Sequence, residues 1–438
     1  MRNFLFSFAL CFFPFILNAQ EVYDLRRCLE TALEKNFNIL LIKNDQQVAT
    51  NNATLGNAGF LPSLDLSAGY SGTLNNPNQK YADGSTVNNR NVLNQNVNLG
   101  LNMQWTIFNG FAMQTNYERL KEFEKMGEIN TRLAIENLIA NLTAEYYNYV
   151  RQNIRLRNLQ SAVVLSKERV RIVETSYIVG SKSRLDLKQA QVDFNADSSN
   201  LIRQYEVLYS SRVALNRLMA IDDVSQEISV TDSLINPDQF LQEELLWTAT
   251  LQSNPMLLLS TKNQTISELD LKNLQSRNYP YLRLNAVYGY TLNAYGSGSM
   301  TQQNNLGFNY GFTLGFNIFD GFNKQREQRN AKIIIQNRKL QTEQLELSLR
   351  ADWVNMWMAY RNNLELIALE KENLEVSRDY YDIAIERYKL DDIAGIQLRE
   401  AQNSLLGAEE RLLQAQFNTK LCEISLLQIS GQIGSYLD

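Results

Sequence analysis

Two pairs of long alternating segments constrain the fold of this 438-residue chain more than any other feature. Within each segment apolar residues alternate with polar residues or glycine, as Leu64, Leu66, Ala68 and Tyr70 do in the first one. A period of two places the apolar side chains on one face of a strand and the polar side chains on the other. The pattern predicts four strands, at about 61–73, 95–108, 279–291 and 306–319.

The surroundings of these strands favour a membrane over a soluble core. Alternation alone is also typical of an antiparallel sheet with one face on a soluble core. These strands, however, are longer than the usual five or six residues, and their polar faces are rich in asparagine and glycine. Aromatic residues also gather at the strand ends, as in barrels with lipid outside and water inside. We expect these at the membrane interface: Trp105, Phe108, Tyr279, Tyr290, Phe316 and Phe319.

Four strands are too few to close a barrel, because about eight is the practical minimum. Unpaired strand edges in a bilayer are too costly to persist. We therefore predict that several copies of the chain share one barrel, with eight strands for two copies and twelve for three. Rotational symmetry would then pair every edge through one repeated contact.

Each strand pair is followed by a region that favours an unusually long helix. The segment of about 111–177 contains no proline and one glycine, and the segment of about 323–388 contains neither. Apolar or aromatic residues recur every seven positions in both, which predicts a left-handed coiled coil. These residues are Ile135, Leu142, Tyr149, Leu156, Val163, Val170 and Tyr177, and then Trp353, Tyr360, Ile367, Leu374, Tyr381 and Tyr388.

Short turns then lead into a return helix in each half, predicted at about 184–219 and 396–430. Ser183 and Asp186 predict a capping box at the first restart. A further helix is expected before each strand pair, within 24–59 and 238–277.

The order of these elements predicts an internal duplication. Phe108 aligns with Phe319 and Tyr177 with Tyr388 at one constant offset of 211 residues. We therefore divide the chain into a first repeat, a connector and a second repeat, preceded by a signal peptide. The predicted bounds are 1–19 for the signal peptide, 20–221 for the first repeat, 222–240 for the connector and 241–438 for the second repeat.

The N-terminal segment predicts export from the cytoplasm. Arg2 precedes a nearly continuous apolar run from Phe4 to Leu17, and a cleavage point follows Ala19. Two cysteines remain after cleavage, Cys28 and Cys422, and their separation leaves open a disulfide or two independent thiols.

Three features together resemble the TolC-like outer-membrane efflux proteins. They are the order of the elements, the junctions Phe108–Phe111 and Phe319–Phe322, and the run Leu185–Gln191 after the turn at Gly180. The resemblance covers essentially the whole mature chain. It implies a mainly α fold with a membrane β-barrel. Three chains would form one twelve-stranded outer-membrane barrel, with four strands per chain, continued by a periplasmic tunnel of helical coiled coils.

The resemblance also implies a function and partners. The homotrimer would lie in outer-membrane lipid and form the exit duct of a tripartite efflux or type I secretion system. It would passively conduct substrates delivered by an inner-membrane transporter, of RND or ABC type, and by a periplasmic adaptor, also called a membrane fusion protein. The alternative is a non-transporting trimeric coiled-coil protein of the surface, anchored by the shared barrel.

In this family the hairpin tips meet the adaptor, and acidic residues near one tip narrow the tunnel entrance. Asp391 departs from the family pattern, because it aligns with Gly180 of the first tip, so identical docking of both tips stays open. By resemblance the adaptor contacts are Val179, Gly180, Ser181, Leu390, Asp391, Asp392 and Gly395.

The candidate gate consists of Asp379, Asp382 and Glu386, whose spacing places them on one helix face. A ring of such residues would favour cations over anions. The alternative is a solvated flank of the coiled coil.

The composition argues against catalysis. The chain has no histidine, the commonest general base and a principal metal ligand, and its two mature cysteines have no metal-binding spacing. A formal net charge of -5 suggests no nucleic-acid partner. We predict neither enzymatic activity, nor a cofactor, nor a metal site, and the cargo is not encoded in any pattern that we recognise.

Overall fold

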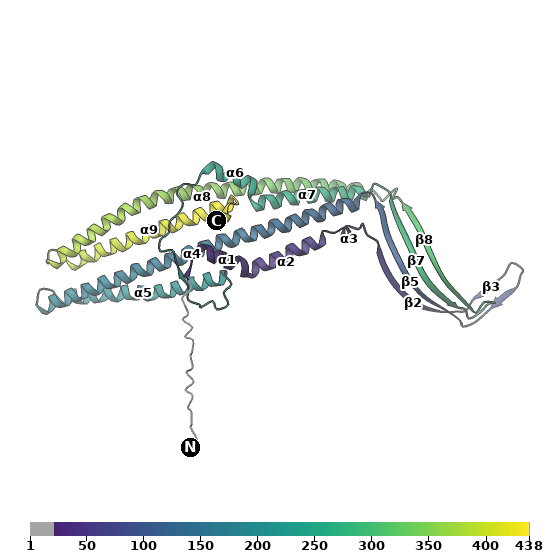
Figure 1. The fold of residues 1–438 in the computed structure, drawn as a ribbon, viewed down its shortest axis with the longest axis horizontal. Coiled ribbons are helices and arrows are strands. Elements are labelled where there is room, and N and C mark those ends of the chain that lie inside the picture. The colour runs from purple at the N-terminus through teal and green to yellow at the C-terminus, as the bar shows by residue number, and fades with distance from the viewer. Residues whose placement is uncertain (1–21, 438) are drawn as a thin grey trace, which may run out of the picture. The chain divides into compact units, whose positions relative to one another are not determined.

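The computed structural model describes residues 22–437, so the predicted signal peptide lies outside the described residues (Figure 1). The chain divides into two compact units. We call them the helical unit and the sheet unit. Of the described residues, the helical unit contains 22–40, Ile135–Gln252 and 351–437, and the sheet unit contains Leu41–Ala134 and Ser253–Arg350.

The sheet unit is built around one antiparallel sheet of four long strands. Their order across the sheet is β2-β5-β7-β8. The strands are β2 (Ser63–Asn75), β5 (Val92–Asn109), β7 (Tyr281–Ala294) and β8 (Gln302–Gly315). β8 begins and ends about four residues before the predicted strand, because Gln302 to Asn305 continue the ladder by pairing with the end of β7. A short hairpin that we did not predict, β3 (Asn78–Lys80) and β4 (Thr86–Asn88), lies between β2 and β5.

The register of this sheet gathers the apolar residues into rows on one face. One row runs across all four strands and contains Leu66, Leu101, Tyr288 and Phe308. These side chains are between 39% and 74% exposed. The next row, on the opposite face, contains Ser67, Gly100, Gly289 and Gly307. The sheet is therefore amphipathic, and its apolar face is exposed.

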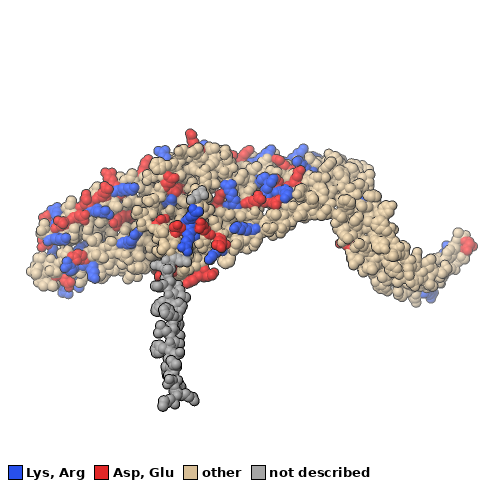
Figure 2. Space-filling model, viewed as in Figure 1, with Lys and Arg blue, Asp and Glu red and all other residues tan. Residues whose placement is uncertain are grey.

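Charge is almost absent from the sheet. Among the residues of the four strands, only Asp65 and Arg283 are charged. The strand segment is correspondingly almost uniformly tan in Figure 2, whereas charged side chains are scattered along the helices. Asparagine side chains supply polarity without charge, as in the hydrogen bond from Asn96 Nδ2 to Asn293 Oδ1 of 2.6 Å.

The two Phe-Asn/Asp-Gly-Phe junctions have the same local structure at the starts of the two long helices. In the first, Gly110 and Phe111 both adopt positive φ, and the Phe108 and Phe111 rings meet edge to face with centroids 5.2 Å apart. Asn109 Oδ1 accepts a hydrogen bond of 3.1 Å from Met113 N, which satisfies one free donor of the new helix.

The second junction repeats each of these features. Gly321 and Phe322 have positive φ, and the Phe319 and Phe322 ring centroids are 5.3 Å apart. Asp320 Oδ2 accepts from Lys324 N at 3.0 Å. The junction sequence thus encodes the change from strand to helix through an edge-to-face aromatic pair, a turn and a side-chain cap.

The sheet unit also contains helices that precede its strands: α2 (Phe37–Asn52), α3 (Leu55–Ala58) and α7 (Pro255–Ser276). We expected one helix before each strand pair, but each is divided. Asn36 ends α1 and Asn254 precedes α7. Asn254 Oδ1 accepts from Met256 N and Leu257 N, and Pro255 occupies the first turn, so this asparagine starts a new helix.

Long helices form most of the helical unit, and two of them, α4 (Ala112–Ile178) and α8 (Asn323–Lys389), begin in the sheet unit. α4 and α8 each have 67 residues, and α5 (Arg184–Leu218) and α9 (Gly395–Ile429) each have 35. Shorter elements complete it: α1 (Leu25–Lys35), α6 (Glu243–Ser253), a 3-10 helix (Ile433–Tyr436), and the parallel pair β1 (Val22–Tyr23) and β6 (Ser229–Val230).

The residues of the predicted seven-residue series are buried more consistently in α8 than in α4. Of the α8 series, all but the partly buried Leu374 are buried. In α4, Leu142 and Tyr149 are buried but Tyr177 is 41% exposed. The buried positions in the distal part of α4 are instead Ala162, Ser166, Arg169 and Val173, so the seam shifts and takes up polar residues.

The connector and the cysteines lie in the helical unit. Asp238 N donates to Glu423 Oε2 at 2.8 Å, and Lys420 Nζ binds the other oxygen of that carboxylate at 2.7 Å. Cys28 and Cys422 are both buried free thiols. Of the two alternatives, a disulfide or two independent thiols, the structure therefore has the second. Burial raises the pKa of the Cys28 thiol to about 12, which keeps it protonated and unreactive.

Replacing the glycine should lower the stability of the fold more at the first junction than at the second. A Cβ at Gly110 would lie 2.1 Å from Ser276 O, whereas the nearest atom to a Cβ at Gly321 would be Asn323 Nδ2 at 3.7 Å. Both glycines have φ of +70°. We expect Gly321→Ala to cost about 1–2 kcal/mol from the left-handed backbone alone. Gly110→Ala should cost about 3 kcal/mol or more, because the backbone must also move.

Thermal unfolding of the two variants, followed by circular dichroism, measures this difference. Equal melting temperatures would contradict the close contact at Gly110.

Candidate functional site

The two hairpin tips have the same backbone, although their sequences differ. At the first tip Gly180 has φ of +84°, its N–H donates to Tyr177 O at 3.0 Å, and Ser181 N donates to Ser176 O at 2.9 Å. At the second tip Asp391 has φ of +59°, and the corresponding bonds join Asp391 N to Tyr388 O and Asp392 N to Arg387 O. Aspartate tolerates this conformation better than most residues, so the departure from glycine preserves the helix end.

The restarts after the two turns are capped differently. Ser183 Oγ accepts from Asp186 N at 3.2 Å, and Asp186 Oδ2 accepts from Ser183 N at 3.0 Å, which confirms the predicted capping box. Ser183 Oγ also donates to Asp186 Oδ2 at 2.7 Å, and this hydrogen bond, together with the one from Ser183 N, lowers the pKa of Asp186. At the second restart Ala394 has no side-chain acceptor, and the cap consists of Gln397 Oε1, which accepts a hydrogen bond from Ala394 N at 3.0 Å. Gly395 is the first residue of α9.

An ion pair joins the two tips. Lys182 Nζ lies 2.5 Å from Asp391 Oδ1 and 5.2 Å from the centre of the Tyr388 ring. The hydrogen bond to Asp391 raises the pKa of Lys182. An interaction that raises the pKa of a lysine stabilises the folded state fully at any pH below the ordinary lysine pKa. This stabilisation is lost only as the pH rises through the raised pKa. The link is therefore intact at neutral pH.

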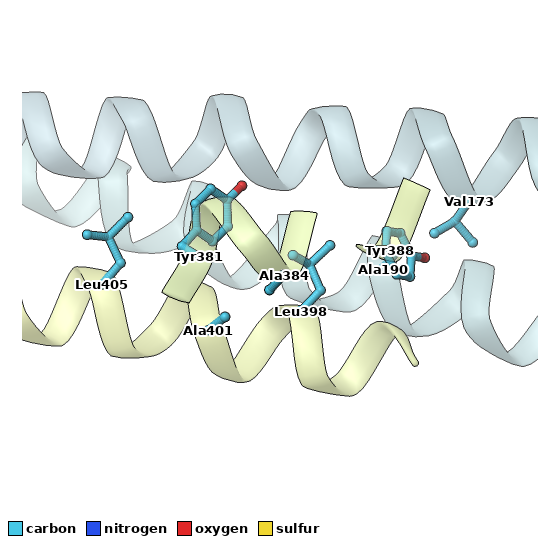
Figure 3. Packing of buried hydrophobic residues seen from close by; sticks show 8 residues of the cluster. All are labelled: Val173, Ala190, Tyr381, Ala384, Tyr388, Leu398, Ala401 and Leu405. Carbon is cyan, nitrogen blue, oxygen red and sulfur yellow. The ribbon is translucent and has the colours of Figure 1, made fainter. Parts of the chain in front are cut away.

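Apolar residues from all four long helices pack beneath the tips (Figure 3). α8 contributes the rings of Tyr381 and Tyr388, which lie over the α9 residues. The full set of buried residues is Val173, Ala190, Tyr381, Ala384, Tyr388, Leu398, Ala401 and Leu405. The two hairpins thus form one packed bundle in this region.

A buried polar layer crosses the bundle further from the tips. Arg399 of α9 makes two hydrogen bonds to the Asp197 carboxylate of α5, of 2.7 and 2.8 Å. Ser166 of α4 donates to the same carboxylate, and Gln402 donates to Ser166 Oγ at 3.1 Å. Asp197, Ser166 and Gln402 are each at most 5% exposed. A second ion pair, between Arg169 and Asp193, joins α4 to α5 nearby.

Sequence reasoning missed this layer. The signal that could have indicated it was the presence of Ser166 and Arg169 where the apolar seam of α4 should continue. A polar residue at a buried coiled-coil position usually has a specific partner.

The candidate gate residues lie on one exposed face of α8. Asp379, Asp382 and Glu386 are all exposed, and within residues 22–437 none of them makes an ion pair. The face continues toward the middle of the helix through Glu372 and Glu375, which are also exposed and which we did not predict. The same spacing of three and four residues would have identified them.

Five of the six aromatic residues expected at the membrane interface lie at or near the two junctions, and Tyr290 is the exception. Phe319 is 70% exposed, Phe316 54%, and Tyr279 packs edge to face on Phe111 with centroids 5.9 Å apart. Trp105 Nε1 donates to Phe60 O at 2.9 Å, which leaves the indole ring 38% exposed. Tyr290 lies within β7, four residues before its end, and is separated from the junctions.

Two further properties of the described chain bear on function. No helix within residues 22–437 is long and apolar enough to cross a membrane. In the same residues, no three acidic or cysteine side chains gather in a way that could hold a metal ion.

Comparison with known proteins identifies the class to which this architecture belongs. The CmeC outer membrane channel of Campylobacter jejuni superimposes with a TM-score of 0.77 at 17% identity, covering 93% of this chain and 85% of that one. The outer membrane protein VceC of Vibrio cholerae gives a TM-score of 0.76 at 16% identity, covering 93% and 96%. The fold is that of the outer-membrane channels.

Sequence comparison points to the same class. Residues 28–221 match the model of a family described as outer membrane efflux protein. Outer membrane protein TolC of Vibrio cholerae is 26% identical over 182 residues, which cover 40% of this chain and 40% of that protein. The matches confirm the resemblance to TolC-like outer-membrane efflux proteins. They also confirm the predicted localisation in the outer membrane, with helices that extend into the periplasm.

Breaking the buried polar layer should destabilise the bundle far more than breaking an exposed pair. Asp197→Leu leaves the Arg399 guanidinium inside the bundle without its carboxylate, which should cost about 3 kcal/mol. In Asp197→Leu/Arg399→Leu no unpaired charge remains, so more than half of the loss should return.

The matched control is Glu168→Gln, which removes the pair with Arg171, whose side chain is 73% exposed. It should cost less than about 1 kcal/mol. Urea unfolding of the four proteins provides the measurement. If the double variant is no more stable than Asp197→Leu, the loss does not come from the unpaired Arg399 charge, and the prediction is contradicted.

Proposed function

We propose that this protein is the outer-membrane exit duct of a tripartite efflux or type I secretion system. The observation that carries the proposal is the amphipathic sheet, whose edge strands β2 and β8 each pair on one side only among the residues that the structure describes. Its exposed apolar face suits contact with lipid, and its face of asparagine, glycine and serine suits contact with water.

Three copies would complete such a barrel. Joining β8 of one copy to β2 of the next gives twelve strands and leaves no edge in the membrane. Rotational symmetry allows the same contact three times. The internal duplication supports this assembly, because the two halves present equivalent junctions at Gly110 and Gly321. The long helices would continue the barrel as a periplasmic tunnel.

The hairpin tips would bind a periplasmic adaptor. Val179 and Leu390, next to the turns, are 74% and 80% exposed, and Gly180 and Asp391 give both tips one backbone shape. Exposed apolar residues on a defined backbone are typical of a binding surface. Ser181, Asp392 and Gly395 would flank these contacts. The energy for transport would come from an inner-membrane transporter of RND or ABC type.

The acidic face of α8 would form the constriction at the periplasmic end. In a threefold assembly Asp379, Asp382 and Glu386 would supply nine carboxylates near one axis. Such a ring repels anions and attracts cations.

Planar-bilayer recording tests the duct directly. The purified full chain should produce discrete conductance steps that are stable over minutes, because water fills the proposed barrel. A protein that incorporates into the bilayer without any conductance would instead be an anchor, which is the alternative function considered above.

Neutralising the constriction should change its ion preference. We expect Asp379→Asn/Asp382→Asn to increase the leak current and to lower the preference for cations, since two carboxylates per chain are removed. The matched control is Glu343→Gln/Glu346→Gln, which removes two exposed carboxylates with the same spacing elsewhere on α8.

Reversal potentials measured in a salt gradient give the ion preference of each variant. An unchanged reversal potential and leak in the Asp379→Asn/Asp382→Asn channel would remove the gate from the proposal.

A further inference from the structure

A pocket of about 410 Å³ lies in the sheet unit where strands meet helices. Its walls come from the end of β5, the start of β7, the end of α7 and the starts of α4 and α8. Three cations line it, Arg277, Arg283 and Lys324, together with one carboxylate, Asp320. Neither the resemblance nor the proposed duct assigns a role to it.

Arg283 is the most unusual of these residues. It is the only cation in the four strands of the sheet, and it pairs in register with Thr106 and Thr313 on the polar face. Its guanidinium carbon lies 4.6 Å from the centre of the Tyr281 ring. Within the described residues it makes no ion pair, so its charge is uncompensated by a direct partner.

The aromatic ring under Arg283 is itself fixed in place. Tyr281 pairs in register with Gly315, and a Cβ at Gly315 would lie 2.3 Å from the Tyr281 ring. The glycine therefore provides the space in which the ring lies. A guanidinium stacked on a fixed ring loses less freedom when it binds an anion, so the arginine is preorganised.

Helix starts add positive potential to the pocket. Ala112, the first residue of α4, and Lys324, the second residue of α8, both line it. Each of these 67-residue helices directs the positive end of its dipole toward the pocket. Lys324 Nζ donates to Asn317 O at 2.9 Å, which uses one of its three donors and leaves two for a ligand.

The opposing groups are fewer and are already engaged. Asp320 Oδ2 accepts from Lys324 N, and Glu327 pairs with Arg277 at 2.6 Å. The end of α7 at Ser276 contributes one negative dipole end. Arg277 is neutralised by Glu327, so two cations, Arg283 and Lys324, and two helix starts face one carboxylate and one helix end, and the balance is positive.

We propose that this pocket binds the phosphate-type oxyanion of a small soluble molecule, with Arg283 and Lys324 as its direct ligands. A phosphate group on a lipid would have the same chemistry. The polar face of the sheet favours the soluble source, because in the proposed duct that face borders water and the apolar face borders lipid. The choice of a soluble source rests on the proposed duct, whereas the phosphate site itself rests on the pocket, so failure of the duct would leave the site standing.

Isothermal titration calorimetry of the purified full chain with inorganic phosphate tests the site. The wild-type protein should bind phosphate saturably. Arg283→Gln and Lys324→Gln should each weaken binding about ten-fold or more, the loss expected for a charge-assisted hydrogen bond. Arg338→Gln, which removes an exposed arginine elsewhere on α8, should leave binding unchanged.

Circular dichroism melting verifies that each variant is folded, and if Arg283→Gln fails to fold, Lys324→Gln decides the result. A parallel arm measures phosphatidylglycerol retained from mixed micelles by native mass spectrometry. The proposal is overturned by the absence of saturable phosphate binding, by equal loss in Arg338→Gln, or by Arg283-dependent lipid retention without phosphate binding.

Discussion

The unpaired edges of one amphipathic sheet are the constraint on which the rest of the structure depends. Within residues 22–437, backbone groups along β2 and β8 have no strand partners on their outer sides, and a broad apolar face is exposed next to them. The unpaired edges are too costly in lipid, and the exposed apolar face is unfavourable in water, so a single copy is stable in neither. A barrel shared by several copies pairs the edges and places the apolar face against lipid. The fold of one chain therefore depends on the proposed assembly.

The helices require a different kind of specificity. A long apolar seam can slide by one heptad at little cost, and polar residues at buried positions oppose this. The bidentate pair between Arg399 and Asp197, with Ser166 and Gln402, has this character, because only one register satisfies every donor and acceptor. The Lys182–Asp391 pair then joins the tips themselves. The hairpins are therefore held by apolar packing and positioned by polar contacts.

Much of this could be predicted from local sequence, because the deciding physics is local. The period of two located the strands, and the junction around Phe108 and Phe319 indicated where they end. Gly180 and Asp391 are different residues, but both have positive φ, and their alignment at the same position of the two repeats indicated this shared conformation. Contacts between distant residues were not predictable in this way. Asp197 and Arg399 are 202 residues apart, and the pocket around Arg283 exists only once five elements meet.

The shared barrel is tested most directly by the mass of the purified protein in detergent, measured by light scattering with the detergent contribution subtracted. We expect three times the mass of the mature chain. A folded protein with the mass of one chain, and with its helices intact by circular dichroism, would contradict the requirement that other copies pair the edges of the sheet.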